Sequence, residues 1–375
     1  MAWKDRSLAE KVGQLFMVGF EGTTVTPELA AWLRRFAWGG VILFGRNAQS
    51  PAQLLALSQT LQVVAQAHSD LPLLIAVDQE GGRVTRLSAP FTVFPSAAML
   101  GCLGSDQLAY EVGRAIAMEL RAVGITMNMA PVLDVLTHPG NSAIGDRSFG
   151  SDPVRVARLG TAFIHGMHAG GLPATGKHFP GHGDTHLDSH VARPVVERSA
   201  AGLEAIELIP FREAIQAGVD ALMTAHVMYT AWDARYPATL SPKILGGVLR
   251  AQLGFRGIIV TDDLIMQAVA DAFPWEEIPL LALRAGADLL LICHHRQRQE
   301  QAYTRVLEAV QSGELPESLV EQAVARIQYV KSWVARQTQE QTPPATLDCI
   351  GCAEHRALAA SIVKGGPHDA RFVVC

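Results

Sequence analysis

The sequence lacks long apolar segments and has few cysteines. No apolar run in its 375 residues reaches the roughly 20 positions that a helix needs to cross a bilayer. The N-terminus also lacks the basic-then-apolar pattern of a secretion signal. The five cysteines are odd in number and unevenly spread, which is unlike a disulfide framework. These absences predict a cytoplasmic protein that does not associate with a membrane.

Strong charge and nucleotide-binding fingerprints are absent as well. The formal net charge is -5, with no basic patch for nucleic acid and no polybasic segment for a membrane surface. The hydrophobic share of 49% excludes a disordered chain and favours a large packed core. No Gly-x-Gly-x-x-Gly motif opens a predicted helix, so a doubly wound open sheet is only the alternative fold.

The sequence does contain an alternation of short apolar runs and helix-like stretches. Eight runs are candidate strands: residues 12–20, 41–44, 73–77, 125–135, 173–176, 221–225, 257–261 and 288–292. Helical patterns follow most of them: residues 27–36, 51–68, 106–123, 153–169, 204–217, 244–253, 279–285, 299–311 and 316–336. The alternation predicts an α/β fold, a single (β/α)8 TIM-type barrel over residues 1–337. Residues 338–375 are predicted to be a linker and a short C-terminal extension without a complete second domain.

Polar residues gather where the predicted strands end. Seven of them stand at or just past a strand end: Asp78, Asn128, Lys177, His178, His226, Asp262 and His294. In barrels, the face at the C-terminal ends of the strands carries the active site. The sequence therefore predicts one pocket built from several distant segments.

The densest cluster of titratable groups is the stretch 177–190. Its four histidines are spaced four residues apart: His178, His182, His186 and His190. A helix would place them on one face, but Pro180, Gly181 and Gly183 make a helix unfavourable there. A loop remains, and a zinc site within it is one open alternative.

The same stretch holds two Asp-x-His pairs, Asp184 with His186 and Asp188 with His190. A carboxylate beside an imidazole fixes its tautomer and makes the ring a proton donor and acceptor suited to neutral pH. The residues alone do not decide which pair serves.

Carboxylates and arginines elsewhere complete the predicted pocket. Asp262 follows a strand and could be a nucleophile, a metal ligand or a helix cap. The role of helix cap suits Asp263 better. Adjacent side chains point in different directions, so at most one of the two is expected to face the pocket. Asp78 and Arg86 could bind hydroxyl groups from opposite sides. Arg147 is either a ligand-facing residue or half of a salt bridge to a loop carboxylate. Such a pocket suits a retaining glycoside hydrolase.

These motifs resemble a known family. The stretch 177–185, followed by residues 188–190, closely resembles the signature of family 3 β-N-acetylhexosaminidases, cytoplasmic enzymes that trim N-acetylglucosamine from cell-wall fragments. The stretches 77–86, 147–150 and 261–264 match the same family in the same order, so the resemblance spans roughly residues 8–334.

The resemblance implies a role for each matching position. Asp262 would be the nucleophile that forms a covalent glycosyl-enzyme, and His190 the acid/base with Asp188 as its partner. Five residues would bind the sugar: Asp78, Arg86, Arg147, Lys177 and His178. The implied activity is a retaining exo-β-N-acetylglucosaminidase acting on a muropeptide or a chitooligosaccharide, without metal or cofactor.

Several alternatives stay open at this point. A family 3 β-glucosidase or β-xylosidase, a metal-dependent barrel hydrolase and a barrel that binds muropeptides without catalysis each fit part of the sequence. Phosphorolysis is a further possibility, because a neutral histidine adds no second negative charge to repel phosphate. Residues 354–359 resemble the opening of a second domain in longer members. Cys349 and Cys352 are expected to be free thiols.

Overall fold

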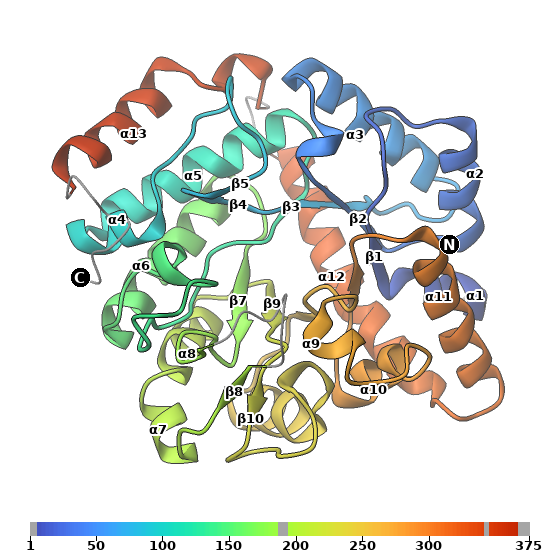
Figure 1. The fold of residues 1–375 in the computed structure, drawn as a ribbon. Coiled ribbons are helices and arrows are strands. Elements are labelled where there is room, and N and C mark those ends of the chain that lie inside the picture. Colours follow the sequence, from blue (N-terminus) through green and yellow to red (C-terminus); the bar gives the residue numbers. More distant parts are fainter. Residues whose placement is uncertain (1–5, 187–193, 341–344, 367–375) are drawn as a thin grey trace.

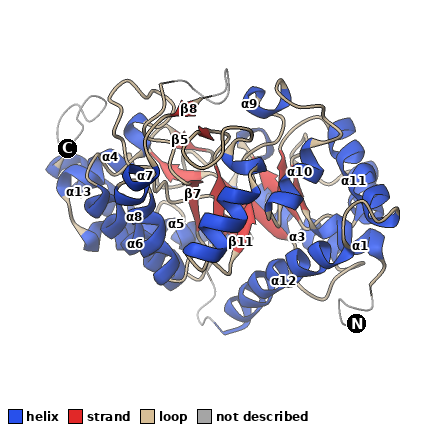
Figure 2. Ribbon diagram, turned by 90° about the horizontal axis from the view of Figure 1, so that it is seen from below, coloured by secondary structure: helices blue, strands red, loops and turns tan. Residues whose placement is uncertain are grey.

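The computed structural model describes residues 6–186, 194–340 and 345–366, and places helices around a centre of parallel strands (Figures 1 and 2). One sheet has five parallel strands in the order β12 (Leu290–Ile292), β1 (Phe16–Val18), β2 (Gly40–Leu43), β3 (Leu74–Val77) and β6 (Met127–Asn128). The other has three, in the order β11 (Ile258–Val260), β9 (Ala221–Thr224) and β7 (Thr175–Phe179). The predicted α/β class with parallel strands is confirmed.

The predicted single closed barrel is not confirmed. The described strands pair into separate sheets, and only isolated bridges lie between them: Asn128 with Ala174, Val132 with Lys177, and Val260 with Leu289. Pro131 accounts for one interruption, because a proline has no N–H to extend the pairing beyond β6. Two short pairs lie apart from both sheets: β4 (Gln79–Gly81) with β5 (Val84–Thr85), and β8 (Val195–Val196) with β10 (Met228–Tyr229).

Most helices follow the predicted pattern, but those over residues 97–103 and 267–270 were not predicted. The α-helices of residues 27–340, with one π-helix, are α2 (Pro27–Phe36), α3 (Pro51–Ala65), α4 (Ala97–Leu103), α5 (Asp106–Ala122), α6 (Pro153–Ala169), α7 (Ala200–Ala205), α8 (Leu208–Gln216), the π-helix η5 (Lys243–Gln252), α9 (Gln267–Ala270), α10 (Ile278–Ala285), α11 (Arg296–Gln311) and α12 (Glu317–Glu340). Ser50 caps α3 as expected, since its hydroxyl accepts from the Gln53 amide at 3.2 Å.

Two boundaries were predicted wrongly. The run 12–20 is not all strand, because α1 (Leu8–Gln14) occupies its start. Ser7 and Glu10 form a capping box that begins this helix, and that signal outweighs the apolar run. The predicted helix over 204–217 is two helices, α7 and α8. Pro210 cannot donate to the preceding turn, so the helix restarts just before it.

The C-terminal extension is folded against the main body. Helix α13 (Ala353–Gly365) contacts α4 and α5, as Figure 1 shows at its red end. Its His355 Nδ1 lies 2.7 Å from Glu119 Oε1 of α5, and both side chains are buried. Residues 345–366 are therefore attached to the domain by a buried polar contact.

Three of the cysteines are free thiols: Cys293, Cys349 and Cys352. Cys102 is disulfide-bonded, so one bridge is present although the cysteines suggested none. Within the described ranges, no helix is both long and apolar enough to cross a membrane.

Candidate active site

A pocket of about 510 Å³ opens where the strands β3, β7 and β11 end. It brings together six of the residues predicted from the sequence: Asp78, Arg86, Arg147, Lys177, His178 and Asp262. His294 also lines it, whereas Asn128 and His226 do not. Asn128 is instead buried against the backbone of Gln79, with hydrogen bonds of 3.0 Å to both its N–H and its carbonyl.

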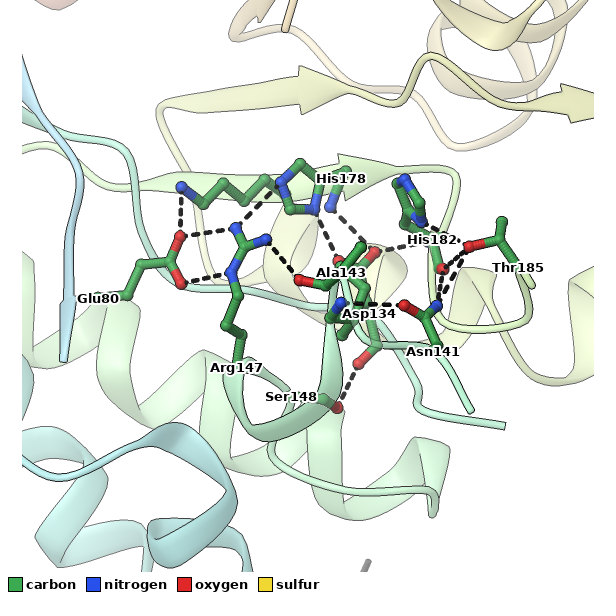
Figure 3. A network of polar contacts seen from close by, with 12 residues as sticks. Glu80, Asp134, Asn141, Ala143, Arg147, Ser148, His178, His182 and Thr185 are labelled. Atoms are coloured by element: carbon green, nitrogen blue, oxygen red, sulfur yellow. Dashed lines mark hydrogen bonds and ion pairs between the residues drawn. The ribbon is translucent and has the colours of Figure 1, made fainter. Parts of the chain in front are cut away.

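Two cations of the pocket, Lys177 and Arg147, converge on Glu80, which was not singled out from the sequence (Figure 3). Lys177 Nζ lies 2.6 Å from Glu80 Oε1 and 2.7 Å from Asp78 Oδ1. Arg147 donates to both Glu80 oxygens, at 2.8 and 2.9 Å. Burial alone would raise the pKa of Glu80, but the charges of Lys177 and Arg147 hold it well below its ordinary value. Glu80 is thus an anion that fixes two cations at the pocket wall.

Arg147 therefore makes the salt bridge that was its alternative role, and it still lines the pocket. Its two-oxygen contact with Glu80 is the fork geometry that arginine favours with carboxylates. Arg86 is freer, with Nη2 3.8 Å from Asp78 Oδ2 and over a third of its side chain exposed. Asp78 lies between Lys177 and Arg86.

A second buried carboxylate, Asp134, orients His178. Asp134 Oδ2 lies 2.7 Å from His178 Nδ1, and Oδ1 accepts from the backbone amides of His178 and His182. Although burial opposes it, the charge of His178 lowers the pKa of Asp134. Because the carboxylate binds Nδ1, the other ring nitrogen of His178, Nε2, is turned toward the pocket. Arg147 Nη2 lies 3.4 Å from this Nε2.

His182 and His186 have different surroundings from His178. Burial lowers the pKa of His182 to about 4, so its ring is neutral, and Nδ1 contacts the Thr185 hydroxyl at 2.9 Å. His186 packs against the ring of His138. His178 lies in β7, whereas His182 and His186 follow it in a loop, so these three do not lie on one helix. No group of three metal-binding side chains is present in the part of the chain that the structure describes. Asp188 and His190 lie outside the described residues.

Asp262 and Asp263 both line the pocket, so the expectation that at most one of them would face it is wrong. They differ in their bonds. Asp263 Oδ1 accepts from the amides of Ile265 and Cys293, at 3.3 and 3.2 Å, and its burial raises its pKa to about 6. The Asp263 amide in turn donates to Asp262 Oδ1 at 2.8 Å. Asp263 is not the helix cap that was predicted, because the next helix, α9, begins at Gln267 with Met266 at its N-cap. Asp263 instead accepts from loop amides, and its own amide orients Asp262.

The family follows from comparison with known proteins. The model of the glycosyl hydrolase family 3 N-terminal domain matches residues 7–330. The chain belongs to glycosyl hydrolase family 3. It is 47% identical over 283 residues, 75% of this chain and 83% of the relative, to a beta-hexosaminidase from Tolumonas auensis.

Solved structures agree with this membership. A family 3 beta-N-acetylglucosaminidase from Paenibacillus sp. str. FPU-7 has a TM-score of 0.91 and 43% identity, covering 96% of this chain and 68% of that one. NagZ from Neisseria gonorrhoeae, solved with N-trifluoroacetyl-D-glucosamine, has a TM-score of 0.74 and 33% identity, covering 93% and 97%. The chain is thus a glycoside hydrolase, as its motifs implied.

One buried acid of this family 3 hydrolase lies beneath the loop that follows β7. Glu207 has no exposed surface, and its burial raises its pKa to about 7, against the opposing charge of Arg198. The carboxyl contacts Arg198 Nε at 3.3 Å. The backbone of Gly181 packs against the same side chain, since a Cβ on Gly181 would lie 2.9 Å from Cβ and Cγ of Glu207.

We expect Glu207→Gln to change how stability depends on pH. An acid whose pKa is raised in the folded state binds more protons there than when unfolded, so the wild type loses stability as pH rises from about 4.5 to about 7. The variant lacks this loss, and its stability relative to wild type should improve by about 2–3 kcal/mol between pH 5 and 8. Denaturant titrations at both pH values measure it.

Glu213→Gln is the matched control, because Glu213 lies on the same helix but is exposed. A difference between Glu207→Gln and wild type that stays constant with pH would show that Glu207 ionises as freely as a surface acid.

Proposed function

We propose that this family 3 hydrolase is a retaining exo-β-N-acetylglucosaminidase. The observation that carries the proposal is the placement of Asp262 in one pocket with a set of polar groups suited to a sugar: Asp78, Arg86, Lys177 and His178. The pocket volume of about 510 Å³ suits a terminal sugar with part of its aglycone. The relatives named beta-hexosaminidase and beta-N-acetylglucosaminidase support the N-acetylated substrate.

In the proposed mechanism, the Asp262 carboxylate attacks the anomeric carbon. The glycosidic C–O bond breaks, and His190, oriented by Asp188, gives its proton to the departing oxygen. A water then loses a proton to His190 and attacks the anomeric carbon of the glycosyl-aspartate, releasing Asp262 and the sugar. Two inversions give net retention. Glu80 contributes indirectly, because it holds Lys177 and Arg147 in place.

The natural substrate is proposed to be a cell-wall muropeptide fragment, with chitooligosaccharides as the alternative. The motif resemblance supports a location in the cytoplasm, where such fragments are broken down. We also infer one (β/α)8 barrel over residues 1–337. The isolated bridges at both edges of the two sheets support it, because each bridge is parallel and joins strands that a barrel would place side by side.

We expect the purified protein to cleave 4-nitrophenyl N-acetyl-β-D-glucosaminide at least about 100-fold faster than the matching glucoside or xyloside. The reason is that a site formed around the acetamido group leaves buried polar groups unpaired when that group is missing. Initial rates on the three substrates measure the preference. Comparable rates on the glucoside or the xyloside would change the assignment to a β-glucosidase or a β-xylosidase.

Two additions to that assay test for metal-dependent hydrolysis and for phosphorolysis. Activity that disappears with a chelator and returns with zinc would favour a metal-dependent hydrolase. Formation of sugar 1-phosphate in phosphate buffer would favour phosphorolysis over hydrolysis.

A further inference from the structure

Arg198 joins three segments of the chain beneath the loop that follows β7. Its Nη2 donates to Asp184 Oδ1 at 2.7 Å and to Thr137 Oγ1 at 3.2 Å. Its Nε lies 3.3 Å from both Asp184 Oδ2 and Glu207 Oε1. Thr137 completes the cluster by donating its hydroxyl to Asp184 Oδ1 at 2.8 Å. These four residues form what we call the Arg198 cluster.

The cluster belongs to a larger frame around the loop. The Tyr229 hydroxyl donates to the Gly181 carbonyl at 2.6 Å, and Asn141 Nδ2 donates to the His182 carbonyl at 2.7 Å. The backbone also packs tightly, because a Cβ on Gly183 would lie 1.8 Å from the Val135 carbonyl oxygen. Hydrogen bonds and close packing therefore hold the backbone of residues 181–183 in place, and the Arg198 cluster holds the side chain of Asp184.

Arg198 differs from an ordinary surface salt bridge in its surroundings. Less than a quarter of its side chain is exposed, and it contacts one carboxylate that is entirely buried and one that is mostly covered. Exposed pairs typically contribute little to stability, whereas a covered, branched contact between separate segments restricts their relative positions. The partners come from the turn after β6, the loop after β7 and the start of α8.

The cluster is also connected to the pocket. Asp184 stands two residues after His182, whose amide is bound by Asp134, and Asp134 binds the pocket residue His178. In the sequence, Asp184 and Arg198 flank the two residues proposed as the proton-transfer pair, Asp188 and His190. The ion pair thus joins the chain before that pair to the chain after it.

We propose that Arg198 is a positioning residue for proton transfer, which it supports by holding Asp184, Thr137 and Glu207 in one frame. This inference rests on the proposed function, in which His190 protonates the departing oxygen. Arg198 does not line the pocket. Its removal should therefore weaken the step that needs the proton and leave sugar binding nearly intact.

The test compares two aryl N-acetyl-β-D-glucosaminides. Phenol is a poor leaving group that needs the proton, whereas 2,4-dinitrophenol leaves without it. For Arg198→Met, we expect kcat/KM on the phenyl substrate to fall about tenfold or more, and on the dinitrophenyl substrate less than about threefold. Arg198→Lys keeps the positive charge but loses the two-pronged guanidinium, so its kcat/KM on the phenyl substrate should lie between those of wild type and Arg198→Met. It replaces Arg198→Met in the test if that variant does not fold.

Two further variants sharpen the result. Arg158→Met removes an arginine whose 2.6 Å contact with Asp106 is half exposed, and it should leave both rates unchanged. The double variant Arg198→Met with His190→Ala should be no slower on the phenyl substrate than His190→Ala alone, because the two residues act on one step.

Equal losses on both substrates, or fully additive losses in the double variant, would overturn the positioning role while leaving the proposed function intact. A wild-type protein that cleaves neither substrate would overturn both.

Discussion

Asp262→Ala should lower kcat/KM on an aryl N-acetylglucosaminide on the order of 10⁴-fold, which corresponds to about 5–6 kcal/mol of transition-state stabilisation. The reason is that the variant has no carboxylate to form the glycosyl-enzyme, and the remaining groups, which bind the sugar and supply the proton, cannot replace it. The fold should persist, because Asp262 lines an open pocket and the amide that donates to it at 2.8 Å, that of Asp263, can turn to water instead. Steady-state rates measure the loss of activity, and circular dichroism measures whether the fold persists.

Azide makes this test specific to the nucleophile. A small anion can occupy the space left by the carboxylate and attack from the same face, giving an α-glycosyl azide from a β-linked activated substrate. The matched control is Asp263→Asn, which keeps the acceptor for the Ile265 and Cys293 amides and should lose far less activity. Wild-type-like turnover in Asp262→Ala, or an equal loss in Asp263→Asn, would remove Asp262 from the mechanism.

Much of the site could be predicted because its residues stand at strand ends. Asp78, Lys177 and Asp262 each follow or end an apolar run, and parallel strands bring such positions to one edge. Glu80 and Asp134 were missed, although Glu80 closely follows a predicted strand and Asp134 lies near the end of another. Their importance comes from what they contact, and a sequence does not show that one carboxylate binds two distant cations.

The fold was predictable to a similar degree. The spacing of apolar residues and the capping residues predicted the ends of most helices to within a few positions, because both signals are local in the sequence. The split at Pro210 was also a local signal that was overlooked. Pairing between strands is not local, so the sequence could indicate parallel strands but not how continuous the sheets would be. The contact of His355 with Glu119 links residues far apart in the chain, and no pattern announced it.

Glu80→Ala should have the second large effect, on both activity and stability. Glu80 is the shared partner of Lys177 and Arg147, and removing one member of a buried ionic group leaves the others uncompensated. We expect the free energy of unfolding to fall by about 3–5 kcal/mol. Because Lys177 and Arg147 then lose their fixed positions, kcat/KM should fall roughly 10²- to 10³-fold.

The control for this prediction is Asp146→Asn. Asp146 contacts Arg83 at 2.7 Å on the rim of the same pocket, where Arg83 is half exposed, so the loss of stability should stay below about 1 kcal/mol. Denaturant titrations and initial rates on all three proteins measure both effects. A Glu80→Ala protein as stable and active as Asp146→Asn would mean that Lys177 and Arg147 hold their positions without Glu80.

The pH dependence gives an independent check on the charge of Glu80. Its pKa is held far below the ordinary value of 4.5, so its stabilising effect is complete above about pH 4.5 and is lost as the pH falls further. The stability difference between wild type and Glu80→Gln should therefore be constant from pH 8 to about pH 5 and shrink below that. A difference that is already shrinking at pH 7 would mean that Glu80 is protonated there, and the two cations would then need another anion to hold them.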